Sequence, residues 1–241
     1  MGRQERSGQW ATLSRDGYKA AQESECRELL KILRERAVAL SSRRYTCGNP
    51  IHQEEERGNS LYVLVEGVVK LFGSYSGGRN FVSLVGPWEF FGHLDLAKEP
   101  VERAYYAEAI TDCEVVKVPK IFVERAMRQQ PEVALKLITL QQIRLAQYEE
   151  LLLGCLLPRK TEVRLANLLM ILVQKFGGHP GTDRLTIGLR MTHQDLAEMV
   201  ASTRESVSNN LSALRNRKMI EMARGNIKIL NPEGLTKLGR F

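Results

Sequence analysis

Residues 45–120 contain short runs of apolar, β-branched and aromatic residues that are separated by glycine. The clearest runs are residues 61–65, 68–72, 80–85 and 113–118. The separating glycines are Gly58, Gly67, Gly73, Gly77, Gly78, Gly86 and Gly92. Many short strands at near-regular spacing predict a β-barrel or a jelly-roll-like sandwich. Helical patterns flank the strands, at about residues 25–40 before them and 120–127 after them.

A long helix is predicted for residues 132–157, which follow Pro131 and contain no internal proline. Its apolar residues recur on one face, which Arg144 and Gln147 interrupt. They are Val133, Leu137, Leu140, Tyr148, Leu151 and Cys155. Such a face fits either a helix that packs on its own barrel or a seam between two copies, in which imperfect heptads are common. We expect the seam, mainly because of the domain that follows it.

Pro158 marks a boundary, because proline cannot continue a helix and biases the residue before it toward extended geometry. Beyond it the pattern predicts a helix at residues 159–176, a turn at 177–181 and a short strand at 185–189. Two helical patterns then follow each other closely, which is typical of a compact helical module.

Residues 191–214 carry the most informative pattern in the chain. Thr192 and Asp195 form a capping-box-like helix start, with aspartate in place of the usual glutamate. Residues 201–203 form a tight turn, and Thr203 can cap the second helix. The predicted buried positions are Leu196, Ala197, Val200, Val207, Leu211 and Leu214. Two short runs at 219–223 and 226–230 then predict a hairpin, so the whole segment predicts a winged helix-turn-helix.

The start of the second helix carries side chains suited to reading base edges in the major groove. Arg204 can contact guanine O6 and N7 in a bidentate manner, and Glu205 can accept from cytosine N4. The other candidate DNA-binding residues are Thr192, Gln194, Thr203, Ser206, Ser208 and Asn209. Two alternatives stay open, since Arg204 could clamp a phosphate and Glu205 could close a capping box with Ser202. Ala201 stands where glycine would more easily adopt a left-handed turn, at a cost on the order of 1 kcal/mol.

The distribution of charge supports a nucleic-acid partner. The net charge is +7, and residues 158–241 hold 14 Lys and Arg against 7 Asp and Glu, whereas residues 1–157 hold 21 of each. The excess of positive charge therefore lies entirely in the last third of the chain. Basic groups in such a module gain free energy by releasing counterions from phosphates.

The remaining composition is that of an ordinary globular protein, with 43% hydrophobic and 26% charged residues. The four cysteines, Cys26, Cys47, Cys113 and Cys155, are widely spaced, so we expect reduced, buried thiols and a cytoplasmic location. Residues 1–24 are expected to be a polar, disordered lead-in without an export signal. No apolar run approaches the length of a membrane span, so no membrane partner is expected.

The order of these parts resembles the cyclic-AMP receptor protein and FNR family of bacterial transcription regulators, most specifically at Ser202-Thr-Arg-Glu-Ser-Val-Ser-Asn. The resemblance implies an α+β fold with a cupin-like, cyclic-nucleotide-binding-like β-roll at residues 25–130. It further implies a dimerisation helix at 131–157 and a winged helix-turn-helix at 158–241. A homodimer would read a TGTGA-like palindrome in double-stranded DNA and act on RNA polymerase. Asn209 stands where the receptor protein has a second arginine. The resemblance therefore does not imply which base pairs are preferred at the inner part of the half-site.

The resemblance also places an effector pocket in the roll. Its positions here are Gly92, His93, Leu94, Arg103, Ala104, Glu149 and Glu150. Gly92 and Arg103 match the receptor protein, whereas the other positions lack the carboxylate and hydroxyls that hold the nucleotide. Each unmade polar contact costs on the order of 1 to 3 kcal/mol, so cyclic AMP is not expected and the effector is either unknown or absent. Arg103 is expected to pair with a carboxylate and to hold the dimer in one state without effector; the candidates are Glu99, Glu102, Glu108 or a glutamate of the long helix.

Two other functions fit the sequence less well. The first is a heme- or redox-sensing regulator of the same fold. In such a regulator, His93 would bind the heme or a cysteine would act as the redox sensor. The second is a metal enzyme on a cupin-like roll, which would need two or three inward histidines with a carboxylate. The roll offers only His52 and His93, without a His-x-His pair, so neither a catalytic nor a metal-binding residue is expected.

Overall fold

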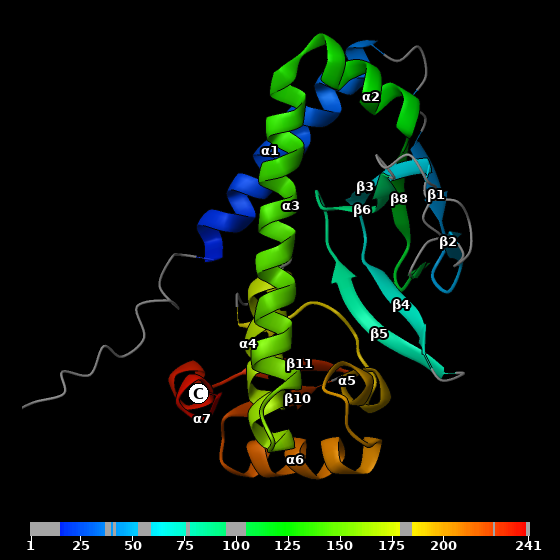
Figure 1. The fold of residues 1–241 in the computed structure, drawn as a ribbon. Helices are drawn as coiled ribbons and strands as arrows, with labels where there is room; N and C mark the ends of the chain where they lie inside the picture. Colours follow the sequence, from blue (N-terminus) through cyan, green and yellow to red (C-terminus); the bar gives the residue numbers. More distant parts are fainter. Residues whose placement is uncertain are drawn as a thin grey trace, which may run out of the picture.

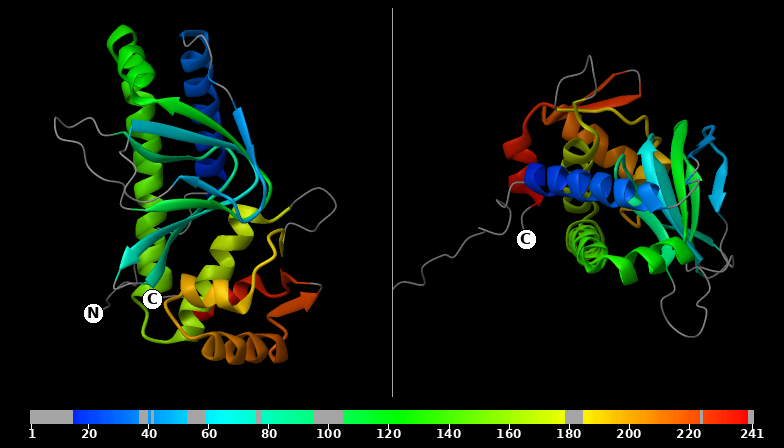
Figure 2. Two further views of the ribbon diagram at one scale, coloured as in Figure 1. Left: turned by 90° about the vertical axis from the view of Figure 1, so that its right-hand side faces the viewer. Right: turned by 90° about the horizontal axis from the view of Figure 1, so that it is seen from above.

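The computed structural model describes residues 15–36, 40, 42–52, 59–75, 78–94, 105–178, 185–223 and 225–239. An N-terminal helix, a β-roll, a long helix and a C-terminal helical domain follow one another along the chain (Figure 1). The expected α+β fold with a β-roll and a C-terminal helix-turn-helix is therefore confirmed. Figure 2 shows that the roll lies beside the long helix and that the C-terminal domain lies below both.

Two four-stranded antiparallel sheets form the roll. The strands are β1 (Ser42–Tyr45), β2 (Pro50–His52), β3 (Asn59–Glu66), β4 (Val69–Tyr75), β5 (Gly78–Val85), β6 (Phe90–Leu94), β7 (Tyr106–Ala109) and β8 (Cys113–Pro119). One sheet has the order β1-β8-β3-β6 and the other β2-β7-β4-β5. Alternate residues of β4, such as Val69 and Leu71, point into the core between the sheets, as the two-residue period of a strand requires.

The N-terminal helix α1 (Arg15–Arg36) begins ten residues earlier than the sequence pattern indicates. The expected lead-in was therefore wrong for residues 15–24, whereas residues 1–14 lie outside the described residues. Cys26, Leu29 and Leu33 of α1 are buried in one cluster with the roll and with α2 (Lys120–Gln129). The polar start of α1 carries few apolar residues, so its helical period was hard to detect.

The long helix α3 (Pro131–Leu151) buries the apolar face that the sequence assigned to a dimer seam. Val133, Leu137 and Leu140 pack against the roll and α1, as in the alternative of a helix packed on its own barrel. A second stripe of α3 and of the turn after it stays exposed. Its members are Leu135, Ile138, Leu145, Leu152 and Leu156, each 43–65% exposed.

The long helix ends in a π-helical turn, η2 (Leu152–Leu156), rather than in a regular α-helix that continues to residue 157. The Leu157 N–H donates to the Leu152 carbonyl, five residues back, at 3.0 Å. Gly154 turns toward the next domain, where the Asn167 amide donates to its carbonyl at 2.8 Å. The π turn therefore keeps the leucines of η2 outside while Gly154 and Cys155 are buried.

The C-terminal domain has one continuous apolar core. Its elements are α4 (Thr161–Phe176), β9 (Thr186–Ile187), α5 (His193–Met199), α6 (Arg204–Asn216), β10 (Ile220–Ala223), β11 (Asn226–Ile229) and α7 (Pro232–Gly239). The strands pair in the order β10-β11-β9, and the β10–β11 hairpin is the predicted wing. Val68 and Leu84 of the roll join this core, so the roll and the domain share a buried contact.

Candidate DNA interface and effector pocket

The first helix of the helix-turn-helix, α5, begins with the predicted capping box. The Thr192 hydroxyl accepts the Asp195 N–H at 3.1 Å, and the Asp195 carboxylate accepts the Thr192 N–H at 2.9 Å. Burial alone would raise the pKa of Asp195, but hydrogen bonds from Thr192 and from Lys70 lower it below its usual value. The helix start is therefore held by an ionised aspartate.

The turn between α5 and α6 has the left-handed backbone expected at Ala201, whose φ is 45°. An alanine in this region costs on the order of 1 kcal/mol relative to glycine. The turn is braced from α4, because Arg164 donates to the Ala201 carbonyl at 3.3 Å and the Thr161 hydroxyl lies 3.3 Å from the Ser202 hydroxyl. Tertiary contacts thus hold a turn whose sequence is not ideal.

The second helix, α6, presents its N-terminal side chains to solvent. Thr203 caps it by accepting the Ser206 N–H at 3.1 Å, and Glu205 is exposed without the capping box to Ser202 that the sequence left open. Arg204 is exposed beside it. The predicted residues that are exposed are Thr192, Gln194, Thr203, Arg204, Glu205 and Asn209, while Ser206 and Ser208 are half-buried.

Ser208 is engaged inside the motif. Its hydroxyl donates to the Arg204 carbonyl at 2.9 Å and lies 2.7 Å from Nδ1 of His193. His193 therefore contacts a candidate DNA-binding residue, although the sequence did not single it out. Its position beside Thr192 and Gln194 was the available indication.

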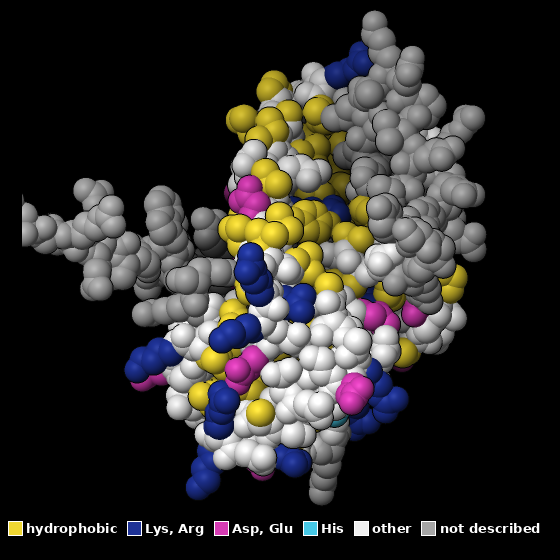
Figure 3. Space-filling view, turned by 60° about the horizontal axis from the view of Figure 1, so that its bottom comes forward, with side chains coloured by type: hydrophobic (Ala, Val, Ile, Leu, Met, Phe, Trp, Pro, Cys, Tyr) yellow, Lys and Arg dark blue, Asp and Glu magenta, His cyan; other side chains and the backbone are white. Residues whose placement is uncertain are grey.

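Basic side chains surround this end of the molecule. Figure 3 shows Lys and Arg side chains spread over the face that carries the helix-turn-helix, with hydrophobic side chains gathered in a band above it. Arg204, Arg215 and Lys218 are exposed. Arg217 lies 2.6 Å from Glu162 of α4, so part of its charge is compensated within the domain.

In the roll, the strand β6 places Gly92 opposite Leu61 of β3, with a φ of 92° that favours glycine. An added Cβ atom there would lie 2.7 Å from the Ser60 carbonyl, so only glycine fits. The Gly92 N–H donates to the Tyr105 hydroxyl at 3.0 Å. His93 and Leu94 follow Gly92 in β6, whereas Arg103 and Ala104 lie outside the described residues, as do Glu99 and Glu102.

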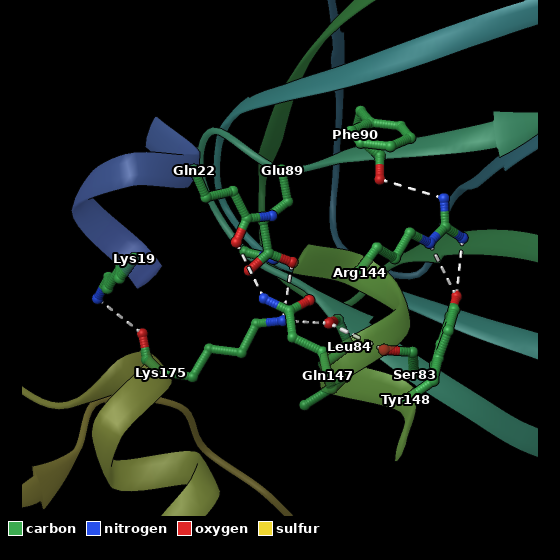
Figure 4. A network of polar contacts seen from close by, with 11 residues as sticks. Lys19, Gln22, Ser83, Leu84, Glu89, Phe90, Arg144, Gln147, Tyr148 and Lys175 are labelled. Atoms are coloured by element: carbon green, nitrogen blue, oxygen red, sulfur yellow. Dashed lines mark hydrogen bonds and ion pairs between the residues drawn. The ribbon is translucent and has the colours of Figure 1, made fainter. Parts of the chain in front are cut away.

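Arg144 is the residue of α3 that lies beside Gly92 and Tyr105. Glu149 and Glu150 were expected there from the sequence. The Arg144 guanidinium donates to the Tyr105 hydroxyl at 2.9 Å. It also donates to the Tyr148 hydroxyl at 2.8 Å and to the Phe90 carbonyl at 3.4 Å (Figure 4). Burial alone would lower the pKa of Arg144, but the two tyrosine hydroxyls raise it, so the cation persists. For Tyr148, burial raises the pKa, which keeps this phenol neutral.

Arg144 thus places a positive charge among neutral hydrogen-bond acceptors, and within the described residues no salt bridge involves it. The sequence indicated Arg144 only as an interruption of the apolar face of the long helix. Beside it, His52 packs in a cluster of rings with Tyr62, Phe91 and Tyr105. These four rings therefore form an aromatic cluster inside the roll, and Arg144 lies at its border.

Glu150 lines a different space, a cavity of about 610 Å³ between α1, β5, α3 and α4, and Glu149, which is exposed, lies at its edge. Lys175 of α4 spans one side of it, because its ammonium donates to the Leu84 carbonyl at 2.7 Å and to Glu89 at 2.8 Å (Figure 4). This cavity lies where the roll, the long helix and the C-terminal domain meet.

The cysteines are all unpaired. Cys26, Cys113 and Cys155 are buried as expected, whereas Cys47 is exposed, contrary to the expectation of four buried thiols. Within the part of the chain that the structure describes, no group of three His, Cys, Asp or Glu side chains could hold a metal ion. None of the described helices has the length and apolar content of a membrane span.

Two family models match the chain. Residues 42–130 match the cyclic nucleotide-binding domain, and residues 163–238 match the Crp-like helix-turn-helix domain. These are the roll and the domain that carries Arg204 and Glu205.

Similar proteins are transcription regulators rather than enzymes. The global nitrogen regulator of Synechococcus elongatus is 32% identical over 202 residues, which are 83% of this chain and 90% of that protein. A CRP-like cAMP-activated global transcriptional regulator of Mycobacterium tuberculosis is 27% identical, over 80% of this chain and 85% of its own. The structure of FixK2 from Bradyrhizobium japonicum is 25% identical with a TM-score of 0.72, over 85% of this chain and 99% of its own. The chain therefore belongs to the CRP/FNR family of DNA-binding transcription regulators.

Proposed function

We propose that the protein acts as a homodimer that reads a pseudo-palindromic, TGTGA-like site in double-stranded DNA and regulates RNA polymerase without a requirement for cyclic AMP. The observation that carries the proposal is the start of α6, where Arg204 and Glu205 are exposed above a capped and buried helix-turn-helix core. A recognition helix enters the major groove with its N-terminal residues at the base edges.

The roles of the reading residues follow from their chemistry. Arg204 makes a bidentate contact with guanine, and Glu205 accepts from the cytosine amino group. Thr192, Gln194 and Thr203 stand at the capped ends of α5 and α6, where hydroxyls, amides and helix N-termini bind phosphates. Ser206 and Asn209 complete the contact surface, and Ser208 supports it from within the motif through its contact with His193.

The exposed stripe of α3 supports the homodimer. Leu135, Ile138, Leu145, Leu152 and Leu156 follow spacings of three, four and seven residues, which is the pattern of a heptad seam. Gln142 and Glu149 occupy the intervening seam positions. Two copies paired in parallel along this stripe bury the leucines and place both recognition helices at the same end of the dimer.

Independence from cyclic AMP is supported by what borders the Gly92 strand. The Gly92 N–H is already bonded to Tyr105, and the Arg144 guanidinium is bonded to Tyr105 and to Tyr148. His93 and Ala104 stand where the receptor protein has a carboxylate and a hydroxyl. The roll therefore joins α3 through its own side chains.

The test is selection of DNA sites from a random library by the purified full chain without effector. The proposal expects a palindrome with half-site centres about 34 Å apart, and affinity that falls steeply with salt. Cyclic AMP is then added to the selected complex, and a visible absorption spectrum is recorded. A large gain in affinity with cyclic AMP contradicts effector independence, a Soret band favours the heme alternative, and selection of single half-sites contradicts the dimer.

A further inference from the structure

A lysine in the roll is buried against the helix-turn-helix. Lys70 lies in β4 and is 4% exposed. Its ammonium is 3.1 Å from the Asp195 carboxylate and 2.8 Å from the Glu198 carboxylate, both in α5. An ammonium ion withdrawn from water is stable only when acceptors of opposite charge surround it. The position of Lys70 therefore depends on the presence of α5.

The direction of Lys70 follows from the strand period. Val69 and Leu71 point into the core of the roll, so Lys70 points to the opposite face of the sheet. Val68 lies on that same outer face and packs in the core of the C-terminal domain. The Lys70 ammonium also lies 4.6 Å from the centre of the Phe72 ring, which shields it from water.

Asp195 connects Lys70 to the DNA-reading apparatus. One oxygen of its carboxylate closes the capping box with Thr192, and the other accepts from Lys70. Because α5 packs on α6 through buried residues such as Leu196 and Val207, a fixed α5 also fixes the recognition helix.

A second ion pair holds the domain at another point. Lys175, at the end of α4, is bonded to Glu89 and to the Leu84 carbonyl of the roll (Figure 4). One contact would allow the domain to rotate about it in any direction, whereas two separated contacts leave only rotation about the line that joins them. The apolar contact of Val68 and Leu84 lies on the same face of the roll.

We propose that Lys70 is a positioning residue for DNA recognition, which fixes α5 and α6 on the roll without a small-molecule effector. The fixed orientation is one that can read DNA, because α6 lies across the end of α3 that is remote from α2 (Figures 1 and 2). In a parallel dimer along α3, both recognition helices then face the same duplex. This inference rests on the proposed dimeric function.

The orientation of the domain affects DNA binding through the fraction of molecules that hold α6 in the reading orientation. When the domain is free to rotate, only a fraction of molecules holds α6 in the reading orientation, and the apparent affinity falls by that fraction. A rotating domain also places the second recognition helix at varied distances from the first. The preferred spacing between half-sites therefore reports on the orientation, whereas a general loss of stability does not change it.

The experiment uses the full chain and a set of palindromes whose central spacers differ by single base pairs. The variants are Lys70→Gln, Glu198→Gln and their combination, with Lys70→Arg as the conservative replacement. Lys136→Gln is the matched control, because Lys136 makes the same kind of paired contact with Glu25 and Glu28 of α1, far from the C-terminal domain. Affinity, spacer preference and thermal unfolding are measured for each.

Lys70→Gln is expected to lower the affinity about tenfold and to widen the range of accepted spacers. Glu198→Gln should act in the same direction, the combination should be no worse than Lys70→Gln alone, and Lys70→Arg should restore the spacer preference. The proposal is overturned if Lys70→Gln keeps the affinity and the spacer preference, or if affinity falls only in step with thermal stability at an unchanged spacer preference. Failure of the unaltered protein to select any palindrome would instead contradict the proposed function.

Discussion

The Nδ1 atom of His193 lies 2.7 Å from the hydroxyl of Ser208, so a side chain of α5 contacts a residue of the recognition helix. Because the Ser208 hydroxyl donates to the Arg204 carbonyl, its oxygen can accept from the His193 ring in the tautomer that carries the proton on Nδ1. The bond links the two helices at the surface that is expected to meet DNA. It also removes the Ser208 hydroxyl from base reading.

Replacement of Arg204 by alanine is expected to relax sequence specificity at one base pair of each half-site. The loss of a bidentate guanine contact should cost about 1 to 3 kcal/mol for the preferred site and much less for sites that carry another base there. Binding to a panel of single-base variants measures the difference. Ser208→Ala is the control and should weaken all sites alike; a uniform loss for Arg204→Ala would mean that this arginine only binds phosphate.

Replacement of Leu145 by glutamate should dissociate the dimer. Leu145 lies in the middle of the exposed stripe, and each leucine withdrawn from water contributes about 1.5 to 3 kcal/mol. Glu149→Leu should have the opposite effect, because two glutamates would face each other across a parallel seam. Sedimentation equilibrium measures the dissociation constant. Ile121→Glu, at an exposed apolar residue of α2 outside the stripe, should leave it unchanged.

Replacement of Ala201 by glycine should stabilise the protein. The φ of 45° at Ala201 is unfavourable for a residue with a Cβ atom, so glycine should raise the free energy of unfolding by about 1 kcal/mol. Ala213→Gly, within α6, should lower it by about 0.5 to 1 kcal/mol. Urea titrations compare the two variants. Destabilisation by Ala201→Gly would show that the packing of the Ala201 methyl group contributes more free energy than the strained backbone angle costs.

The contribution of Asp195 to stability should be lost only in acid. Its pKa in the folded chain is lowered below its ordinary value of 3.8, so its stabilising effect is full above that value and declines as the pH falls through the folded pKa. The difference in free energy of unfolding between the unaltered protein and Asp195→Asn should be constant from about pH 8 to about pH 5 and shrink below about pH 4. A difference that stays constant or grows as the pH falls below about 4 would mean that the pKa is not lowered.

Alkylation of the native protein should label Cys47 alone. Burial and the nearby Glu89 charge raise the pKa of Cys26 to about 12, although Arg27 acts in the opposite direction. This thiol is therefore unreactive at neutral pH. Burial also raises the pKa of Cys113. Mass spectrometry after iodoacetamide treatment should find one modified cysteine, and four after unfolding in urea. Cys47→Ser should remove the native reaction, and labelling of Cys26 would contradict its burial.

The helix-turn-helix could be predicted almost to the residue because its determinants are local. A cap at Thr192, a turn at Ala201 and a cap at Thr203 each act within a few residues. The faces of α3 could not be predicted in the same way. Two apolar stripes run along this helix, and the stripe that packs inside is decided by α1 and the roll, which are distant in sequence.

The polar contacts between domains were missed for a related reason. Arg144 appeared only as an interruption of an apolar face, and Lys70 only as one lysine in a strand between Val69 and Leu71. Their partners, Tyr105 for Arg144 and Asp195 for Lys70, are 39 and 125 residues away. A charged residue inside an otherwise apolar run was the only indication that such partners exist.

The π turn after α3 sets a strict limit on how the chain can vary in length at this point. It accommodates one residue more than an α-helical turn, which lets Gly154 meet Asn167 while Leu152 and Leu156 stay on the outer stripe. Deletion of one residue here would rotate every later side chain by about 100°, since a helix turns by that angle per residue. The leucines and the glycine would then exchange sides, so insertions and deletions in related sequences should avoid residues 152–156.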